Sequence, residues 1–335
     1  AIERNGYRSI SADFPWVNRY RKAKEQYQKL IPSIRKDNIL KRRTPERLIA
    51  GLIAASILAK CGCELRGVPG FFRIDGVWCF NLEPGMLIPT RNAVGQIVAL
   101  QVRRDKPSDW NDYCKRTGQN KEFLRYMTIS AKGLPDGVTT DISQAHFPLG
   151  NDSLDDPETA VCITEGPLKA DAAVELKGNR KMFFIALHGT SNTKTMPAIF
   201  AWLKGKGVET VFNVFDMDKV TNVNVAKAGK RVRAIAAGYG IKLAEKCWDA
   251  EYAQQKLSEL NAICCEHGIF VPTTFNVFTD LANVSQELAK RNIRHSRVKN
   301  ADGLEEKHYW SDKTKGIDDY LLSIRTATGG EGASA

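Results

Sequence analysis

The chain has 335 residues, a length typical of two or three domains, and 43% of them are hydrophobic, which is enough to build proper cores. Its formal net charge of +11 favours a polyanionic partner, nucleic acid first, with a merely solvated basic surface as the alternative. No apolar run reaches the roughly 18 residues that span a bilayer, and no signal peptide opens the sequence, so we expect a cytoplasmic protein without a membrane segment.

The 8 cysteines agree with that compartment. No pair of them has the Cys-x-x-Cys spacing, which argues against a zinc ribbon, and the adjacent Cys264 and Cys265 are poorly placed for a disulfide. We therefore expect reduced cysteines of a cytosolic protein.

Residues 1–66 are predicted to form a basic helical segment. The ranges 22–31 and 45–60 have helix-favouring composition, and Thr44 with Pro45 is a typical helix start. The many lysines and arginines of this segment indicate either an arm that contacts DNA or RNA or a solvated helical face.

Residues 67–158 are predicted to form a basic, antiparallel β-rich subdomain. Short strands alternate with turns such as Asp75-Gly76 and 92–95. A set of basic residues follows the last strands, and we expect them to form one phosphate-binding surface, although each alone is also an ordinary surface charge. They are Arg103, Arg104, Arg125 and Lys132.

From residue 159 the pattern alternates between strands and helices, which predicts an α/β domain with a parallel sheet flanked by helices over 159–325. The expected strands are 161–164, 182–187 and 211–215, and the expected helices lie near 167–177, 194–204 and 222–238. Further helices are expected near 249–266 and 280–291, with a strand at 269–272 between them. Residues 326–335 are predicted to be a disordered tail.

Acidic residues follow two of these strands. Glu165-Gly166 comes after the first, with a helix beginning at Pro167, and Asp216 and Asp218 follow the third. In an extended segment side chains alternate, so the two aspartates are expected to point the same way. With Glu165 they are candidate ligands for a hard cation, Mg2+ or Mn2+. The alternative is a set of solvated strand-end acids.

Three further features are expected near these acids, at the edge of the sheet where the strands end. Asp318 and Asp319 open a short helix; Asp318 is a candidate metal ligand and Asp319 a helix N-terminal acid. The loop 188–191 presents backbone N–H groups to phosphate or is a plain turn. Lys169, one helical turn beyond Glu165, binds a phosphate or is solvated.

These motifs resemble the TOPRIM domain of DnaG-type primases, topoisomerases and some nucleases. The resemblance lies in Glu165-Gly166, in the Asp-x-Asp of Asp216 and Asp218, and in the later Asp318 before a short helix. The ranges 86–103, 124–130 and 187–191 resemble primase stretches. The range 313–322, with Lys315, is similar to the end of primase-like modules of phages, plasmids and integrated elements. The segment after Asp218 departs from the primase pattern, which usually continues with a Gly-rich turn.

The resemblance implies a metal-dependent nucleotidyltransferase that makes short primers on single-stranded DNA from nucleoside triphosphates, in replication of a mobile element, with a replicative helicase as a further partner. Glu165, Asp216 and Asp218 would be catalytic, and these with Asp318 would hold Mg2+ or Mn2+. The residues expected to bind nucleic acid or nucleotide are Arg103, Arg104, Arg125, Lys132, Lys169 and Lys315. The alternatives are a TOPRIM nuclease and a non-catalytic DNA-binding replication module.

Overall fold

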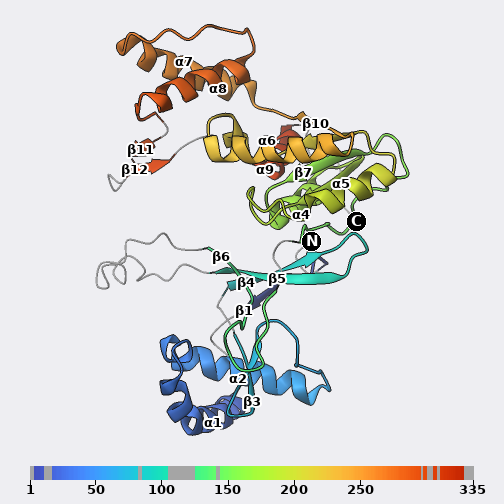
Figure 1. Ribbon diagram of the computed structural model, residues 1–335, viewed down its shortest axis with the longest axis vertical. Helices are drawn as coiled ribbons and strands as arrows, with labels where there is room; N and C mark the ends of the chain where they lie inside the picture. The colour runs from blue at the N-terminus through green and yellow to red at the C-terminus, as the bar shows by residue number, and fades with distance from the viewer. Residues whose placement is uncertain are drawn as a thin grey trace. The chain divides into compact units, whose positions relative to one another are not determined.

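The computed structural model describes residues 4–10, 17–81, 85–104, 125–140, 144–295, 297–299, 305–307 and 310–327. The chain divides into two compact units, Ala1–Ile142 and Ser143–Ala335 (Figure 1). The finer division into segments 1–66, 67–158 and 159–325 stays a prediction. In the described ranges no helix is both long and apolar enough to cross a membrane.

The helical part of the first unit consists of α1 (Val17–Lys36), the 3₁₀ turn η1 (Leu40–Arg42) and α2 (Pro45–Lys60). Helix α2 begins and ends where the sequence predicts, because the Thr44 hydroxyl accepts a hydrogen bond from the Arg47 N–H and Pro45 occupies the first helical position. Its apolar side chains, among them Leu48 and Leu52, pack against α1 and against Phe72 of the following hairpin.

The β-rich part of the first unit has two antiparallel sheets. Strands β2 (Phe71–Ile74) and β3 (Val77–Phe80) form a hairpin. Its two-residue turn, Asp75-Gly76, takes positive φ at both positions, as a tight hairpin turn requires. The second sheet has the order β1-β4-β5-β6. Its strands are β1 (Arg8–Ile10), β4 (Gly85–Arg91), β5 (Ile97–Arg104) and β6 (Tyr126–Thr128).

The second unit contains a four-stranded, entirely parallel sheet, which confirms the predicted α/β class. The elements in chain order are β7 (Ala160–Thr164), α4 (Pro167–Leu176), β8 (Met182–Ala186), α5 (Met196–Gly205), β9 (Thr210–Asn213), α6 (Val223–Gly238) and β10 (Lys242–Glu245). The strand order is β10-β9-β7-β8, so β7 and β9 are central. Strand β10 was not among the predicted strands.

Helices cover both faces of this sheet (Figure 1). Val161 and Ile163 of β7 point into a core shared with α5 and α6. Cys162 lies on the opposite face, in a core shared with α4 and with α9 (Ile317–Ala327). Burial on both faces explains why the strands read as continuous apolar runs.

The part between β10 and α9 is a helical hairpin, α7 (Ala250–Glu266) and α8 (Val277–Lys290), followed by the short pair β11 (Arg297–Lys299) and β12 (Glu305–Lys307). The strand predicted at 269–272 is wrong: the segment is a loop in which Phe270 is solvent-exposed. Helix α8 begins at 277, earlier than predicted, because Asn276 caps it. Residues 326 and 327 end α9, and the rest of the predicted tail lies outside the described residues.

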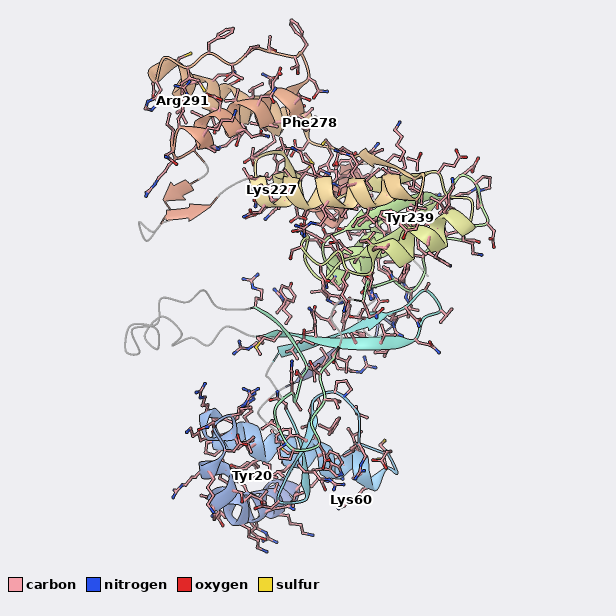
Figure 2. The ribbon with its side chains drawn as sticks, viewed as in Figure 1. Tyr20, Lys60, Lys227, Tyr239, Phe278 and Arg291 are labelled. Atoms are coloured by element: carbon pink, nitrogen blue, oxygen red, sulfur yellow. The ribbon has the colours of Figure 1, made fainter. Side chains whose placement is uncertain are left out.

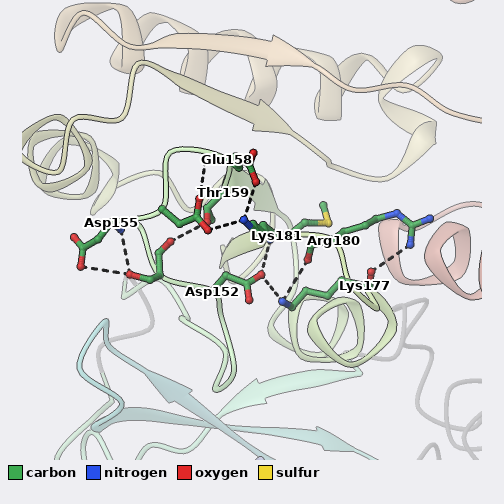
Figure 3. Close-up of polar contacts among 10 residues, drawn as sticks. Asp152, Asp155, Glu158, Thr159, Lys177, Arg180 and Lys181 are labelled. Atoms are coloured by element: carbon green, nitrogen blue, oxygen red, sulfur yellow. Dashed lines mark hydrogen bonds and ion pairs between the residues drawn. The ribbon is translucent and has the colours of Figure 1, made fainter. Parts of the chain in front are cut away.

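A polar network fastens the amino-terminal edge of this sheet (Figure 3). The Asp152 carboxylate accepts hydrogen bonds from Lys177 Nζ, at the end of α4, and from the Met182 N–H (2.6 Å), at the start of β8. Lys181 forms ion pairs with Asp156 (2.9 Å) and Glu158 (2.7 Å). The segment before β7 thus ties β8 to α4 at the edge opposite the acidic residues.

Candidate active site

The acidic residues lie at the point of the sheet where the order of the strands reverses. The chain leaves β7 for β8 on one side and then crosses to β9 on the other side of β7, so the carboxyl ends of these two central strands form a topological switch point. Glu165 directly follows β7, and Asp216 stands three residues beyond the end of β9. Open parallel sheets bind their ligands at this place.

Lys169 lies between two of these carboxylates. Gly166 is the N-cap of α4 and Pro167 its first residue, so Glu165 directly precedes the helix and Lys169 lies four residues beyond it, in the first turn. Its Nζ atom is 2.9 Å from Glu165 Oε1 and also donates a hydrogen bond to Asp216 Oδ1. The sequence indicated a phosphate-binding or solvated lysine; in the structure its ammonium joins two acids.

Asp216 and Asp218 do come together, but for a different reason than predicted. Strand β9 ends at Asn213, and Asp216 begins the 3₁₀ turn η2 (Met217–Val220), so the two aspartates do not alternate along an extended strand. Both face Lys315, whose Nζ atom is 3.8 Å from Asp216 Oδ2 and 3.7 Å from Asp218 Oδ2. The carbonyl of Lys315 in turn accepts a hydrogen bond from the Met217 N–H (2.8 Å).

Asp318 joins this cluster through the start of α9. A Cβ atom built on Gly316 would lie within 4 Å of both Asp318 Oδ1 and Asp216 Oδ1, so the two carboxylates border one small space beside this glycine. Asp319 accepts a hydrogen bond from the Gly316 N–H (2.9 Å). It therefore caps the helix, as the sequence indicated.

Two residues that the sequence did not single out hold the Lys315 segment in place. The indole N–H of Trp248 donates to the Thr314 carbonyl (2.6 Å), and the Thr314 hydroxyl donates to the Asp249 carboxylate. The Trp248 ring stacks on Tyr320 of α9, with centroids 5.5 Å apart. No local pattern marks this contact, because its partners are 66 residues apart.

Burial raises the pKa of Glu165, Asp218 and Asp318 in this cluster. The pKa of Glu165 rises to about 7, because burial is reinforced by the negative charge of Asp216 and only partly opposed by Lys169. The pKa of Asp318 rises to about 6, through burial and then the adjacent charge of Asp319.

The pKa values of Asp218 and Lys169 are shifted by the same two factors, burial and the charges of neighbouring side chains. Burial, helped by Asp216 and opposed by Lys315, raises the pKa of Asp218. Burial works against the charge of Lys169, but the carboxylates of Glu165 and Asp216 outweigh it and raise the pKa of this lysine. Lys169 is therefore a fixed cation at neutral pH.

The carboxylates of this cluster are suitable ligands for a hard cation, but in this structure they are not arranged around a common metal position. Within the described ranges no group of three or more His, Cys, Asp or Glu side chains is arranged to hold a metal, since the lysines lie among the acids. Yet Asp218 Oδ1 and Asp318 Oδ1 are buried and have no hydrogen-bond partner among the described residues. Buried, unpaired carboxylate oxygens are the ligands that Mg2+ and Mn2+ prefer.

The loop 188–191 lies at the same edge, but one of its N–H groups is already used. The Gly189 N–H donates to the backbone carbonyl of Glu165 (2.9 Å), so it fixes the position of that residue rather than facing a ligand. Burial and the neighbouring imidazole of His146 lower the pKa of His188 to about 4, so this side chain is neutral at physiological pH.

The predicted basic surface belongs to the first unit. Arg103 and Arg104 end β5 beside Arg125, and the Arg104 N–H donates to the Arg125 carbonyl (2.7 Å). Lys132 lies beyond the other end of β6, past Ile129, whose N–H donates a hydrogen bond to the Leu100 carbonyl. The structure thus brings the three arginines to one end of the sheet and leaves Lys132 apart from them.

No protein-family model and no curated protein sequence matches the chain, so the similar proteins found are all solved structures. A structure of the Aquifex aeolicus primase, with its zinc-binding and RNA polymerase domains, aligns at 12% identity and a TM-score of 0.39 over 87% of this chain. A DnaG primase catalytic domain bound to single-stranded DNA aligns at 16% identity and a TM-score of 0.34 over 70% of the chain. A DNA primase domain from Pseudomonas aeruginosa aligns at 15% identity and a TM-score of 0.35 over 69%.

The chain spans 64% of the Aquifex protein and 67% of each of the other two. At these identities and TM-scores the likeness assigns no activity to this chain.

Proposed function

We propose that the chain is a TOPRIM-type, primase-like nucleotidyltransferase, which joins nucleoside triphosphates into short primers on single-stranded DNA during replication of a mobile element. The observation that supports this most is the cluster at the switch point, where Asp216, Asp218 and Asp318 come from two distant segments. Two of their buried oxygens have no hydrogen-bond partner among the residues that the structure describes. A cytoplasmic location and a helicase partner belong to the same proposal.

Mg2+ or Mn2+ would be held by Asp216, Asp218 and Asp318, with Glu165 as a fourth ligand or as the group that takes the proton of the attacking 3′-hydroxyl. A divalent ion there would neutralise charge on the reacting phosphate. The chain's own contribution is to hold these carboxylates at one point of a rigid sheet edge, which orients the nucleotide relative to the primer end.

The lysines have a complementary role in this proposal. Lys169 and Lys315 already neutralise the acids, and each carries an ammonium that can turn to a triphosphate once a divalent ion binds the carboxylates. Arg103, Arg104 and Arg125 of the first unit would hold phosphates of the template or the nucleotide, since arginine binds phosphate in a bidentate way. Lys132 is a further template contact.

One observation favours a second candidate, a non-catalytic DNA-binding replication module. Lys169 donates hydrogen bonds to both Glu165 and Asp216, so these two acids have a protein-borne cation as partner. If that pairing persists in the presence of Mg2+, the site is structural and the chain binds DNA without acting on it.

A primer-synthesis assay separates these functions. The purified 335-residue chain is incubated with single-stranded DNA, labelled nucleotides and Mg2+ or Mn2+. The double variant D216N/D218N, which keeps the size of both side chains, is assayed beside it. Oligonucleotides made by the wild type and not by the variant support the primase. Metal-dependent shortening of the template supports a nuclease instead, and DNA binding without either product supports the non-catalytic module.

A further inference from the structure

Helix α6 carries a cationic face that the proposed active site does not use. Lys227, Lys230, Arg231 and Arg233 are exposed, and the helix contains no acidic residue. Arg233 pairs with Glu245 of β10 (2.5 Å), whereas no ion pair within the described part of the chain involves the other three. Their charge is therefore available to an external anion.

Lys230 and Arg233 of this face line a groove of about 700 Å³ between α6 and the start of α8, called here the α6–α8 groove, and Lys227 and Arg231 lie outside that lining. Its lining includes Lys230, Arg233, Gly229 and Ala226 of α6 and Asn276 and Phe278 of α8. Figure 2 labels Lys227 on α6 and Phe278 on α8. The small residues of α6 keep the groove open, and the capped N-terminus of α8 adds its positive dipole to the cationic wall.

The loop that enters α8, residues 267–276, presents two aromatic side chains to solvent. Phe270 is 87% exposed and Phe275 is 94% exposed, the largest values among the exposed hydrophobic side chains of the described residues. Exposed rings of this size in one loop indicate a contact surface, because a solvated phenyl ring gains nothing from folding.

The loop 267–276 has a defined conformation that hydrogen bonds hold in place. The buried Asp280 carboxylate accepts hydrogen bonds from the Thr273 hydroxyl, the Thr274 N–H and the Thr274 hydroxyl, each 2.7 Å long. The Thr273 hydroxyl also accepts from the Phe275 N–H (3.2 Å). This network holds Phe275 in the left-handed region, with φ of 60°, which is costly for an aromatic residue. Backbone strain is thus retained at the residue whose ring is most exposed.

We infer that the α6–α8 groove and the loop 267–276 together bind single-stranded nucleic acid. A cationic groove that follows the phosphates and exposed rings on which bases stack are the two parts of such surfaces, whereas a duplex hides its base faces. Glu245 lines the groove as the opposing charge, but it is engaged by Arg233 and by Asn213. This surface goes beyond the proposed polymerising site, because it needs neither the acids nor a metal ion.

The test is the affinity of the full chain for fluorescein-labelled oligothymidylate, measured by fluorescence anisotropy at several salt concentrations without divalent ions. We expect F275A and F270A each to weaken binding about tenfold, since base stacking on an aromatic side chain has that order of effect. K227E/K230E reverses one charge in the groove lining and one on the same helix outside it. It should weaken binding and reduce the slope of log affinity against log salt by about 0.7 for each phosphate contact that is lost.

The matched controls are V94A, which removes an apolar side chain that is 78% exposed in the first unit, and K204E, which reverses an exposed charge on α5. Neither should change the affinity by more than about twofold. Failure of the proposed polymerase activity leaves this experiment unaffected, because it is read without nucleotides or metal.

F275G separates binding from a structural role of the loop. Glycine accepts the left-handed conformation without strain, so we expect a higher melting temperature together with weaker binding, and F275Y should keep wild-type affinity. Oligonucleotides containing 5-iododeoxyuridine should crosslink to the peptide that carries Phe275. Wild-type affinity in F275A and in K227E/K230E, or crosslinks that all fall outside residues 219–286, would overturn the inference.

Discussion

The ammonium group of Lys169 donates a hydrogen bond to the carboxylate of Asp216, although the two residues are 47 positions apart in the chain. The contact joins α4 to the loop after β9 and places a fixed cation at the switch point of the sheet. Because the same ammonium binds Glu165, this one side chain decides how much negative charge the acidic cluster presents to a ligand.

Replacing this lysine by methionine tests the charge balance. In K169M the carboxylates of Glu165 and Asp216 lose their shared cation, so we expect the free energy of unfolding without divalent ions to fall by about 3 kcal/mol. Mg2+ or Mn2+ should then raise the melting temperature more in K169M than in the wild type, because the ion substitutes for the missing ammonium. Thermal unfolding with and without metal measures both effects.

K194M is the matched control for that experiment, since Lys194 is exposed in the loop after β8 and no ion pair of the described residues involves it. Its melting temperature should not respond to metal differently from that of the wild type. An equal metal response in K169M and the wild type would show that the carboxylates do not bind the ion.

Gly316 gives a second test of the cluster. A methyl group at this position would collide with Asp318 Oδ1 and would lie 3.2 Å from Asp319 Oδ2 and 3.5 Å from Asp216 Oδ1. We expect G316A to displace the Asp318 carboxylate and to weaken Mn2+ binding about tenfold, at a cost of about 1 kcal/mol in stability. Isothermal titration calorimetry and urea unfolding measure the two quantities.

For comparison, an added Cβ at Gly205, the last residue of α5, meets nothing within 4 Å. G205A should leave metal binding unchanged and be neutral or stabilising, since alanine is the better helix former. If G316A binds Mn2+ as the wild type does, Asp318 is not a ligand.

Trp248 is expected to act on the site through the segment that carries Lys315. W248F removes the N–H that donates to the Thr314 carbonyl and leaves a smaller ring against Tyr320, so stability should fall by about 2 kcal/mol. Amide hydrogen exchange over 311–316 should increase, because the Thr314 contacts weaken. If W248F is destabilised but amide hydrogen exchange over 311–316 is unchanged, Trp248 stabilises the hydrophobic core and does not hold the Lys315 segment in place.

The contact between Asp152 and Lys177 predicts a pH-dependent stability. Burial opposes the charged form of Asp152, but hydrogen bonds from Lys177 and the Met182 N–H outweigh it and lower the pKa of this carboxyl. A lowered carboxyl pKa contributes stability that is present above the unfolded value of about 3.9 and is lost as the pH falls through the folded value. D152N should therefore be less stable than the wild type by about 1.5 kcal/mol at pH 7, and this difference should disappear as the pH falls below the lowered folded pKa of Asp152.

The neighbouring pair of Asp156 and Lys181 supplies the control, because both side chains are more exposed. D156N should unfold as the wild type does at pH 7, as expected for a surface ion pair. A stability gap for D152N that stays constant from pH 7 to pH 3 would contradict the assignment of the effect to its charge. Chemical denaturation at each pH gives the comparison.

The sequence alone determined helix α2, the strands β7, β8 and β9, and the position of each acid along the chain. They were predictable because periodicity, caps and strand ends are local signals. The loop between α7 and α8 was read as a strand for the same local reason: a short apolar run does not reveal that Phe270 has no core to enter.

The tertiary structure alone decided which side chains meet. The order β10-β9-β7-β8 brings Glu165 and Asp216 to one switch point, the turn η2 rather than an extended strand aims Asp216 and Asp218 at Lys315, and Trp248 fixes the segment that bears it. These contacts join residues far apart in the chain and depend on strand order and packing, which local patterns do not specify. The same limit applies to the α6–α8 groove, whose cationic wall and aromatic loop come from separate segments that only folding brings together.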